Sequence, residues 1–281
     1  MKIPNKGRLY STDLAIERRR ADTELAGVEY TKSDGEIGVW ERLSVRSEEG
    51  ARSIGKPEGE YDTLTLGRMN ELDTMGIDDA ADEVARELCR LIEIEGVCPE
   101  RLLVVGLGNP ALTPDSVGPR AAGLVEPTLH IKRGDEEMFY SLECSEIAVL
   151  TPGVRAKSGI ETAEMVAGVA RSVRPDALIV IDALAARSPK RLGTTIQFSN
   201  TGIRPSSGVG MHMAAIDEGL VRVPVISIGV PTVIDSRLFV EEESEETDGM
   251  LVSPKDIDEV VDAAAKIISA GINQAFGIYL F

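Results

Sequence analysis

The feature that most constrains the fold is a series of short apolar segments that begins after residue 100. The segments are LLVVGLG, IAVLTPG, ALIVIDA, TTIQFS and PVISIGVP, and helical patterns at 119–126, 161–173 and 254–272 lie among and after them. Uninterrupted apolar runs that alternate with helices are typical of strands covered on both faces of a parallel sheet. The sequence therefore predicts a three-layer α/β sandwich built around a mostly parallel central sheet.

The first hundred residues follow a different pattern. EIGVWERLSV and EYDTLTLG, within residues 36–67, alternate in polarity and predict antiparallel, hairpin-type strands added to the main sheet. Residues 73–95 carry apolar side chains at helical spacing. Residues 1–35 are charged and weakly periodic, so we expect a loosely attached leader over 1–35 and a single domain over 36–281.

Charge and composition exclude several classes of function. The net charge of −17 argues against a nucleic-acid partner, which requires a basic surface. No run approaches the roughly 20 apolar residues of a membrane span, and the N-terminus lacks the apolar core of a secretion signal. The three cysteines form no C-x-x-C pair, which suits a reducing cytoplasm.

The glycine-rich loop in VVGLGNPALTPDSVGP, residues 104–119, permits two interpretations. Gly106, Gly108 and Ala111 fit the G-x-G-x-x-A pattern of a dinucleotide turn, which keeps a nucleotide-binding oxidoreductase open as an alternative. Pro110, however, removes an amide donor that a pyrophosphate would use. No acid ends a second strand about 20 residues later, where a ribose would be held.

The second interpretation starts from acids at strand ends. Asp115 lies in the loop after the first apolar segment, Asp182 ends ALIVID, and Asp235 follows PVISIGVPTVI. Because ligands of open parallel sheets bind beyond the carboxyl ends of the strands, these acids are candidates for one site. The competing interpretations are a helix cap for Asp115, a loop hydrogen bond for Asp182 and a surface turn for Asp235. Pro119 is expected at the first position of the helix that follows the loop.

Other chemistries have weaker support. Cys144 with His130 or His212 could form a thiol dyad, but isolated residues of these types are more often structural. RPSSGVG lacks the first glycine of a nucleophile elbow, and no H-E-x-x-H zinc motif is present.

Several motifs together are specific. VVGLGN, TPDSVGP, SGIET, PDALIVIDALAARS, TTIQFSNTGIRPSSGVG, VPVISIGVPTVID and VSPKDID occur in this order. The chain resembles the germination protease family, the endopeptidases that degrade small acid-soluble spore proteins, from about residue 8 to residue 275. The resemblance implies a phosphorylase/hydrolase-like α/β fold, a homotetramer, and a zymogen located in the cytoplasm of the forespore or spore core.

The resemblance also implies an atypical aspartic-type mechanism in which Asp115 and Asp182 form the catalytic pair, with no cofactor and no metal ion. The loop with its GLGN and PD motifs is similar to that of hydrogenase-maturation endopeptidases as well. A metal-dependent maturation-type endopeptidase therefore remains an alternative. The histidine that completes the site in that family has no match in this sequence.

The N-terminal region contains two copies of a substrate-like pattern. TDLAIE, residues 12–17, and TELAG, residues 23–27, each present Thr, an acid, a large apolar residue and Ala, which resembles the family's cleavage site. We therefore expect a self-processing precursor cut between Asp13 and Leu14, with cleavage after Glu24 as the secondary candidate. A short charged helix that starts near Thr12 is the competing interpretation.

Overall fold

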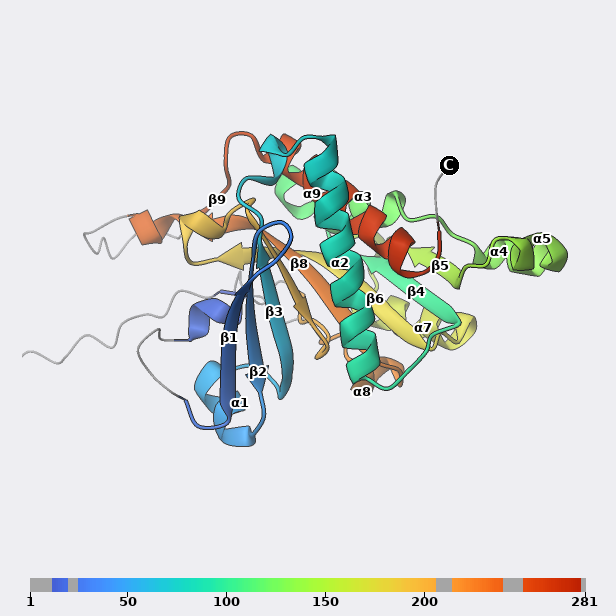
Figure 1. Ribbon diagram of the computed structural model, residues 1–281, viewed down its shortest axis with the longest axis horizontal. Helices are drawn as coiled ribbons and strands as arrows, with labels where there is room; N and C mark the ends of the chain where they lie inside the picture. The colour runs from blue at the N-terminus through green and yellow to red at the C-terminus, as the bar shows by residue number, and fades with distance from the viewer. Residues whose placement is uncertain (1–11, 20–24, 206–213, 240–249, 279–281) are drawn as a thin grey trace, which may run out of the picture.

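The computed structural model describes residues 12–19, 25–205, 214–239 and 250–278. Within these residues the chain forms one nine-stranded sheet with helices on both faces (Figure 1), which confirms the predicted α/β class. Its strands are β1 (Val28–Asp34), β2 (Val39–Val45), β3 (Gly59–Thr65), β4 (Arg101–Gly106), β5 (Glu146–Leu150), β6 (Ala177–Ala186), β7 (Thr195–Ser199), β8 (Val225–Asp235) and β9 (Leu251–Val252).

The α-helices are α1 (Glu48–Ile54), α2 (Thr74–Ile94), α3 (Val117–Gly123), α4 (Leu129–Gly134), α5 (Glu136–Ser141), α6 (Arg155–Ser158), α7 (Thr162–Val173), α8 (Glu218–Val221) and α9 (Ile257–Ala275). Short 3-10 helices are η1 (Ile16–Arg18), η2 (Met69–Glu71), η3 (Thr113–Asp115), η4 (Pro189–Arg191) and η6 (Ser236–Phe239). Within the described residues, no helix combines the length and the apolar character needed to cross a membrane.

The sheet is mixed, with a parallel and an antiparallel half. Its strand order is β1-β2-β3-β7-β8-β6-β4-β5, and β9 pairs with β8. Strands β5, β4, β6 and β8 are mutually parallel, whereas β1, β2, β3 and β7 join β8 through antiparallel pairs. The apolar segment TTIQFS, which forms β7, is thus not part of the parallel set. Only residues 187–194 connect β6 to β7, too few for the crossover that a parallel strand requires.

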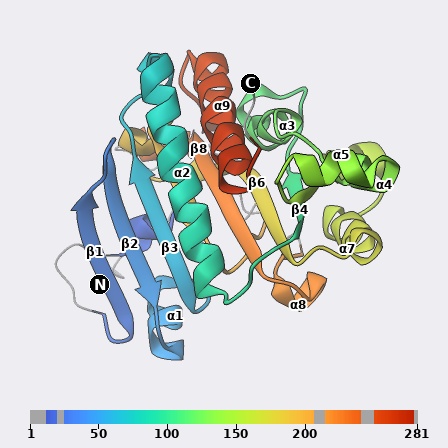
Figure 2. The same cartoon turned by 45° about the vertical axis from the view of Figure 1, so that its right-hand side comes forward.

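Helices α2 and α9 lie side by side across one face of the sheet (Figure 2). The predicted apolar stripe of α9 is buried in this core. The helix begins at Ile257 and not, as expected, at Pro254. The carboxylate of Asp256 accepts a hydrogen bond from Asn70 at 3.0 Å and pairs with Arg68, so the chain before Ile257 is a turn held against η2.

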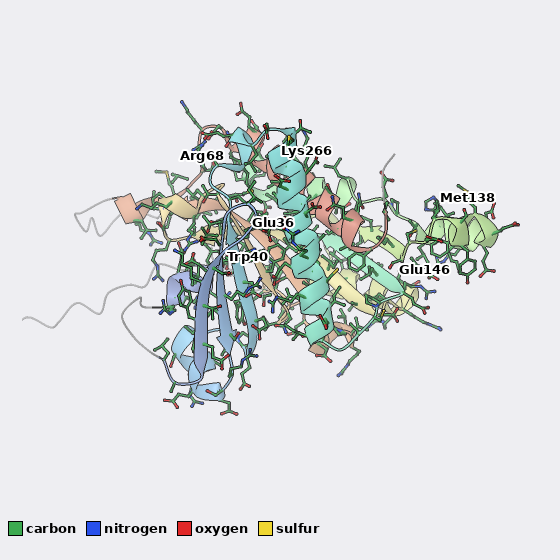
Figure 3. The ribbon with its side chains drawn as sticks, in the orientation of Figure 1. Glu36, Trp40, Arg68, Met138, Glu146 and Lys266 are labelled. Carbon is green, nitrogen blue, oxygen red and sulfur yellow. The ribbon has the colours of Figure 1, made fainter. Side chains whose placement is uncertain are left out.

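Strand β2 and the residues just before it are hydrogen-bonded to helix α2 through the carboxylate of Glu83. Trp40 on β2 and Glu36 before it (both labelled in Figure 3) donate to the carboxylate of Glu83 on α2. The Trp40 Nε1 bond is 3.0 Å long and the Glu36 N–H bond is 2.7 Å long. This acid is almost fully buried, and its bonds hold the antiparallel half of the sheet under α2.

On the opposite face, helix α7 covers the parallel half of the sheet, where it packs on β4 and β6. Over β6 and its neighbours β8 and β7 the cover is the N-terminal segment 12–19, whose Leu14 and Ile16 pack on Leu184 and Ala186. Strand β1, which also falls in the range expected to be a loosely attached leader, pairs with β2 along its full length. Both parts of the range are thus packed on the domain.

Candidate active site

The loop after β4 folds back and presents Asp115. Gly108 has a φ of +119°, and a Cβ there would lie 2.0 Å from the backbone oxygen of Asp115, so the turn requires glycine. The N–H of Asn109 donates to Asp115 Oδ2 at 2.9 Å and to its backbone oxygen at 3.0 Å. Burial raises the pKa of the Asp115 carboxyl, and the bond from Asn109 opposes that rise. The loop therefore acts as a platform that fixes the direction of one carboxylate.

Two further glycines bring this platform against β6. A Cβ at Gly118 would lie 2.4 Å from the oxygen of Ile181, and one at Gly106 would lie 2.2 Å from the oxygen of Gly118. Helix α3 and the preceding η3 therefore approach the strand backbone as closely as the chain allows. This approach is what sets the loop acid beside the strand acid that follows Ile181.

That strand acid, Asp182, is 5% exposed and lies inside β6. The strand does not end there as predicted, because residues 183–186 continue to pair with β8. Burial raises the pKa of Asp182 well above its usual range, the charges of Asp115 and Asp13 raise it further, and the N–H of Ala183, which donates to Oδ1 at 2.9 Å, opposes the rise. The predicted pair Asp115 and Asp182 is thus brought together, and a third carboxylate joins it.

Asp235, the third acid suggested by strand position, lies elsewhere. Asp182 is paired with Gly229 on β8, and Asp235 is six residues farther along that strand, about 20 Å away at the usual rise per residue. Its carboxylate accepts two bonds from the Arg237 Nε, at 2.9 and 3.1 Å, and the side-chain hydrogen bond from Arg237 lowers its pKa. Asp235 therefore belongs to an ion pair at the end of β8.

The third carboxylate of the site comes from the N-terminal segment. The N–H of Asp13 donates to the carbonyl oxygen of Ala185 at 2.9 Å, and the N–H of Ala185 donates back to Asp13 Oδ2 at 2.9 Å. Leu14 is fully buried, and Glu17 accepts from the N–H groups of Arg187 and Ser188 at 2.6 and 2.7 Å. The sequence TDLAIE is thus held along β6 directly beyond Asp182.

Sequence patterns did not identify two residues that complete this region. Gln197 on β7 accepts the N–H of Ala15 at 2.7 Å through Oε1, and Gly229 on β8 lies between Gln197 and Asp182 in the strand register. The available signal was a single amide, 8% exposed, between the apolar residues Ile196 and Phe198. A buried polar side chain of this kind requires a hydrogen-bond partner, which the local sequence does not supply.

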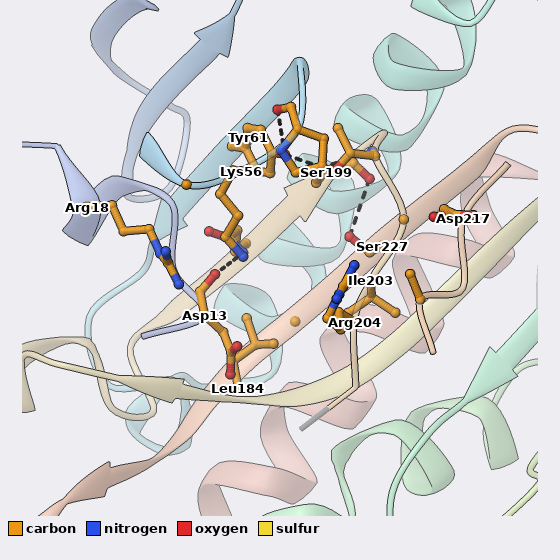
Figure 4. A pocket seen from close by; sticks show the side chains of 17 residues that line it. Asp13, Arg18, Lys56, Tyr61, Leu184, Ser199, Ile203, Arg204, Asp217 and Ser227 are labelled. Carbon is orange, nitrogen blue, oxygen red and sulfur yellow. Dashed lines mark hydrogen bonds between the residues drawn. The ribbon is translucent and has the colours of Figure 1, made fainter. Parts of the chain in front are cut away.

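A cavity of about 360 Å³ opens beside the N-terminal segment (Figure 4). Burial lowers the pKa of Lys56 in its wall to about 8, an effect that the charge of Asp13 opposes. The wall carries three basic side chains, Arg18, Lys56 and Arg204, and two carboxylates, Asp13 and Asp217. The basic side chains thus outnumber the acids in this wall, although the chain as a whole is strongly acidic.

The other chemistries gain no support from the geometry. The N–H of Asn109, which a pyrophosphate would need, is already bound to Asp115, and Pro119 is the third residue of α3, not its first. Burial raises the pKa of the Cys144 thiol, the opposite of what an activated thiolate requires. His212 lies outside the described residues. In the described ranges, no three His, Cys, Asp or Glu side chains are arranged to hold a metal ion.

Comparison with known proteins identifies similar chains. The sequence model of the germination protease family matches residues 9–246. The germination protease of Caldanaerobacter subterraneus is 37% identical over 94% of this chain and 93% of that protein, and that of Clostridium perfringens is 33% identical over 94% of both. The germination protease of Priestia megaterium is 38% identical over 80% of this chain and 64% of its own length. The crystal structure of a NiFe hydrogenase maturation protease, HycI from Thermococcus kodakarensis, aligns with a TM-score of 0.38 at 15% identity, over 64% of this chain and 99% of that one.

Proposed function

This chain belongs to the germination protease family and is therefore a protease, and we propose that Asp115 and Asp182 are the pair of carboxyl groups with which it hydrolyses peptide bonds. One observation carries the proposal. The substrate-like segment TDLAIE lies along the strand that bears Asp182, with Asp13 near enough for its charge to raise the pKa of Asp182.

The chemistry follows from the shared environment of the two acids. Peptide hydrolysis needs a base that takes a proton from water and an acid that protonates the leaving amine. Two carboxyls held close together and away from water resist losing both protons, so the pair that shares one proton offers a base and an acid together. The pair titrates as a unit, and its two members exchange the roles of acid and base within one catalytic cycle.

The same geometry supports a zymogen that processes itself. In this proposal the bond between Asp13 and Leu14 is the scissile bond, and residues up to Asp13 are the leader that covers the site. Leu14 and the residues to Arg19 remain packed on β6 after cleavage because Leu14 and Ala15 are fully buried. The second candidate, Glu24, lies outside the described residues.

The substrates proposed from the family are small acid-soluble spore proteins, cut after an acidic residue that is followed by a large apolar residue and Ala. Disordered chains of this kind enter a cleft without prior unfolding. The cations Lys56 and Arg204 in the cavity wall supply the positive charge that an acidic side chain would meet. A homotetramer in the cytoplasm of the forespore or spore core completes the proposal.

The decisive experiment is N-terminal sequencing of the full-length chain before and after incubation near pH 6, alongside Asp115→Asn. The expected result is a new terminus at Leu14 in the wild type only. In parallel, an unstructured acidic spore-type protein is incubated with the processed chain and its cut sites are read by mass spectrometry.

The Asp115→Asn chain is the control for contamination. An identical cut in that variant would assign the cleavage to another protease and overturn the self-processing mechanism. Cut sites without an acid before the bond would overturn the proposed specificity.

A further inference from the structure

Three neighbouring strands carry aligned residues beneath the docked segment. Gln197 on β7 and Asp182 on β6 are both paired with Gly229, on the β8 strand between them. Residues paired across strands point to the same face, and two strand spacings separate their backbones by about 10 Å. The central residue has no side chain, and the side chain of Leu184 fills the space above it, since a Cβ at Gly229 would lie 2.4 Å from Leu184 Cδ1. Leu184 in turn packs against Leu14 and Ile16 of the docked segment.

Gln197 makes two contacts with the docked peptide, one on each side of the Asp13–Leu14 bond. Its Oε1 accepts the N–H of Ala15 at 2.7 Å, and its Nε2 donates to the carbonyl oxygen of Asp13 at 3.4 Å. The first contact fixes the orientation of the amide, because an N–H can bond only to the oxygen end. The nitrogen end is therefore aimed at the carbonyl that hydrolysis must attack.

Resting on the proposed function, we propose that Gln197 is a third catalytic residue, which holds the scissile carbonyl and donates a hydrogen bond to its oxygen as negative charge develops there. Water adds its oxygen to the Asp13 carbonyl carbon and gives one proton to the charged member of the carboxyl pair. The carbonyl electron pair moves to the oxygen held by Nε2. As that pair returns, the C–N bond breaks, and the protonated carboxyl gives its proton to the Leu14 nitrogen.

A neutral donor suits this place better than a cation. A lysine or arginine so close would stabilise the charged form of Asp182 and lower its pKa, which would remove the proton that the leaving amine needs. An amide donor stabilises the developing oxyanion without that effect. In the catalytic sites of other hydrolases, one preorganised donor of this kind accelerates the reaction by about 10² to 10³-fold.

The test measures cleavage of the docked leader in the full-length chain. Because the leader is already bound, its cleavage is first order and reports the chemical step without a separate binding step. Gln197→Glu keeps the acceptor for the N–H of Ala15 but replaces the donor with a second oxygen. We expect its rate to fall about 10² to 10³-fold at neutral pH and to recover toward acid pH, where the protonated carboxyl donates again. Gln197→Met should cleave more slowly by the same factor at neutral pH, and its rate should not recover toward acid pH.

Two measurements separate catalysis from docking and folding. Hydrogen exchange of residues 12–16 should stay protected in Gln197→Glu, since the contact with Ala15 is retained. Thr63→Val is the matched control, because Thr63 is fully buried beside Gln197 in the register and its Oγ1 has no hydrogen-bond partner in the described residues. Its cleavage rate should equal that of the wild type.

The inference is overturned if Gln197→Glu cleaves within threefold of the wild type, if its pH profile is unchanged, or if loss of protection in residues 12–16 accompanies the loss of rate. Asp182→Asn, run in parallel, distinguishes this outcome from failure of the proposed function. An active Asp182→Asn would reject the carboxyl pair itself, whereas an inactive Asp182→Asn with a fully active Gln197→Glu would reject only the role of Gln197.

Discussion

Two groups of buried carboxyls occupy opposite faces of the same sheet. On the face covered by α2 and α9, Asp62 of β3 lies near Glu87 of α2, and both carboxyl groups pair with Arg42 and Arg90. On the other face, the charges of Asp115 and Asp13 act on Asp182, whereas the cations Arg18 and Lys56 act on Asp13. Burial and the neighbouring Glu87 raise the pKa of Asp62 to about 8 despite the two arginines, and burial raises that of Asp182 as well.

A raised pKa therefore does not by itself distinguish a catalytic carboxyl from a structural one. Asp62 is fully buried under α2, in contact with Arg42 and Arg90, so it can neither reach a peptide nor exchange protons with one. Asp182 lies on the face where a peptide segment is docked, near a glycine and an amide. The two groups differ in whether a peptide lies within reach of the carboxyl, and not in how far the pKa values are raised.

The largest expected effect contrasts the two groups directly. Asp182→Asn should reduce cleavage of the leader and of an acidic protein substrate by about 10² to 10⁴-fold, the usual contribution of an acid–base group. Asp62→Asn should leave the rate within twofold of the wild type, because Asn resembles the protonated carboxyl already present there. Gel-based rates for both variants test this, and equal losses in the two would erase the distinction.

The second contrast concerns stability, for which we expect the larger loss in the group of Asp62 and Glu87 and the smaller loss at Asp182. Glu87→Ala should lower the free energy of unfolding by about 2 to 3 kcal/mol, because it leaves two arginines facing one carboxyl; their partial exposure keeps the loss at this level. Asp182→Ala should change stability by about 1 kcal/mol or less, since no described cation loses a partner. Urea unfolding followed by the fluorescence of Trp40, the single tryptophan, measures both. A larger loss in Asp182→Ala would show that Asp182 also has a structural role.

The third effect is a pH dependence. The folded chain holds a proton on Asp62 up to about pH 8, whereas the unfolded chain releases it near pH 4. The stability linked to this group is complete below pH 4 and is lost as the pH rises through 8, with a slope of at most about 1.4 kcal/mol per pH unit. Unfolding at pH 5, 6.5 and 8 should show a weaker decline in Asp62→Asn than in the wild type. Parallel declines would mean that the two arginines keep Asp62 charged.

The smallest expected effect is a shift in the pH dependence of leader cleavage at the site that contains Asp182. The charge of Asp13 is one of the causes that raise the pKa of Asp182. Asp13→Asn should therefore lower that pKa and move the alkaline limb of the leader-cleavage profile toward lower pH, and its maximal rate should fall because the acid before the scissile bond is lost. First-order rates from pH 5 to 8 measure the limb. A limb shifted toward higher pH would contradict the effect of the Asp13 charge on the carboxyl pair.

Much of the fold and half of the site were predictable from local pattern. Helix α2 matches the predicted helix almost residue for residue, and the family identified from VVGLGN, TPDSVGP and IDALAAR is confirmed by comparison. The pairing of Asp115 with Asp182 was also predicted, from the rule that ligands bind beyond the carboxyl ends of parallel strands, although Asp182 lies inside β6 and not at its end. By the same rule Asp235 was included wrongly, since β8 extends about 20 Å past the residue that faces Asp182.

The sequence by itself determined the buried strands β4, β6 and β8, the long helix α2 and the position of the substrate-like TDLAIE. These properties depend on the order of side chains within a few residues. Only the tertiary structure decided that β7 pairs antiparallel with both β3 and β8, that Gln197, Gly229 and Asp182 align, and that residues 12–19 pack across β6. Strand order and register join residues far apart in the chain through backbone hydrogen bonds, which every residue type makes alike. For this reason a local pattern predicts that a strand is buried but does not predict which strand lies beside it.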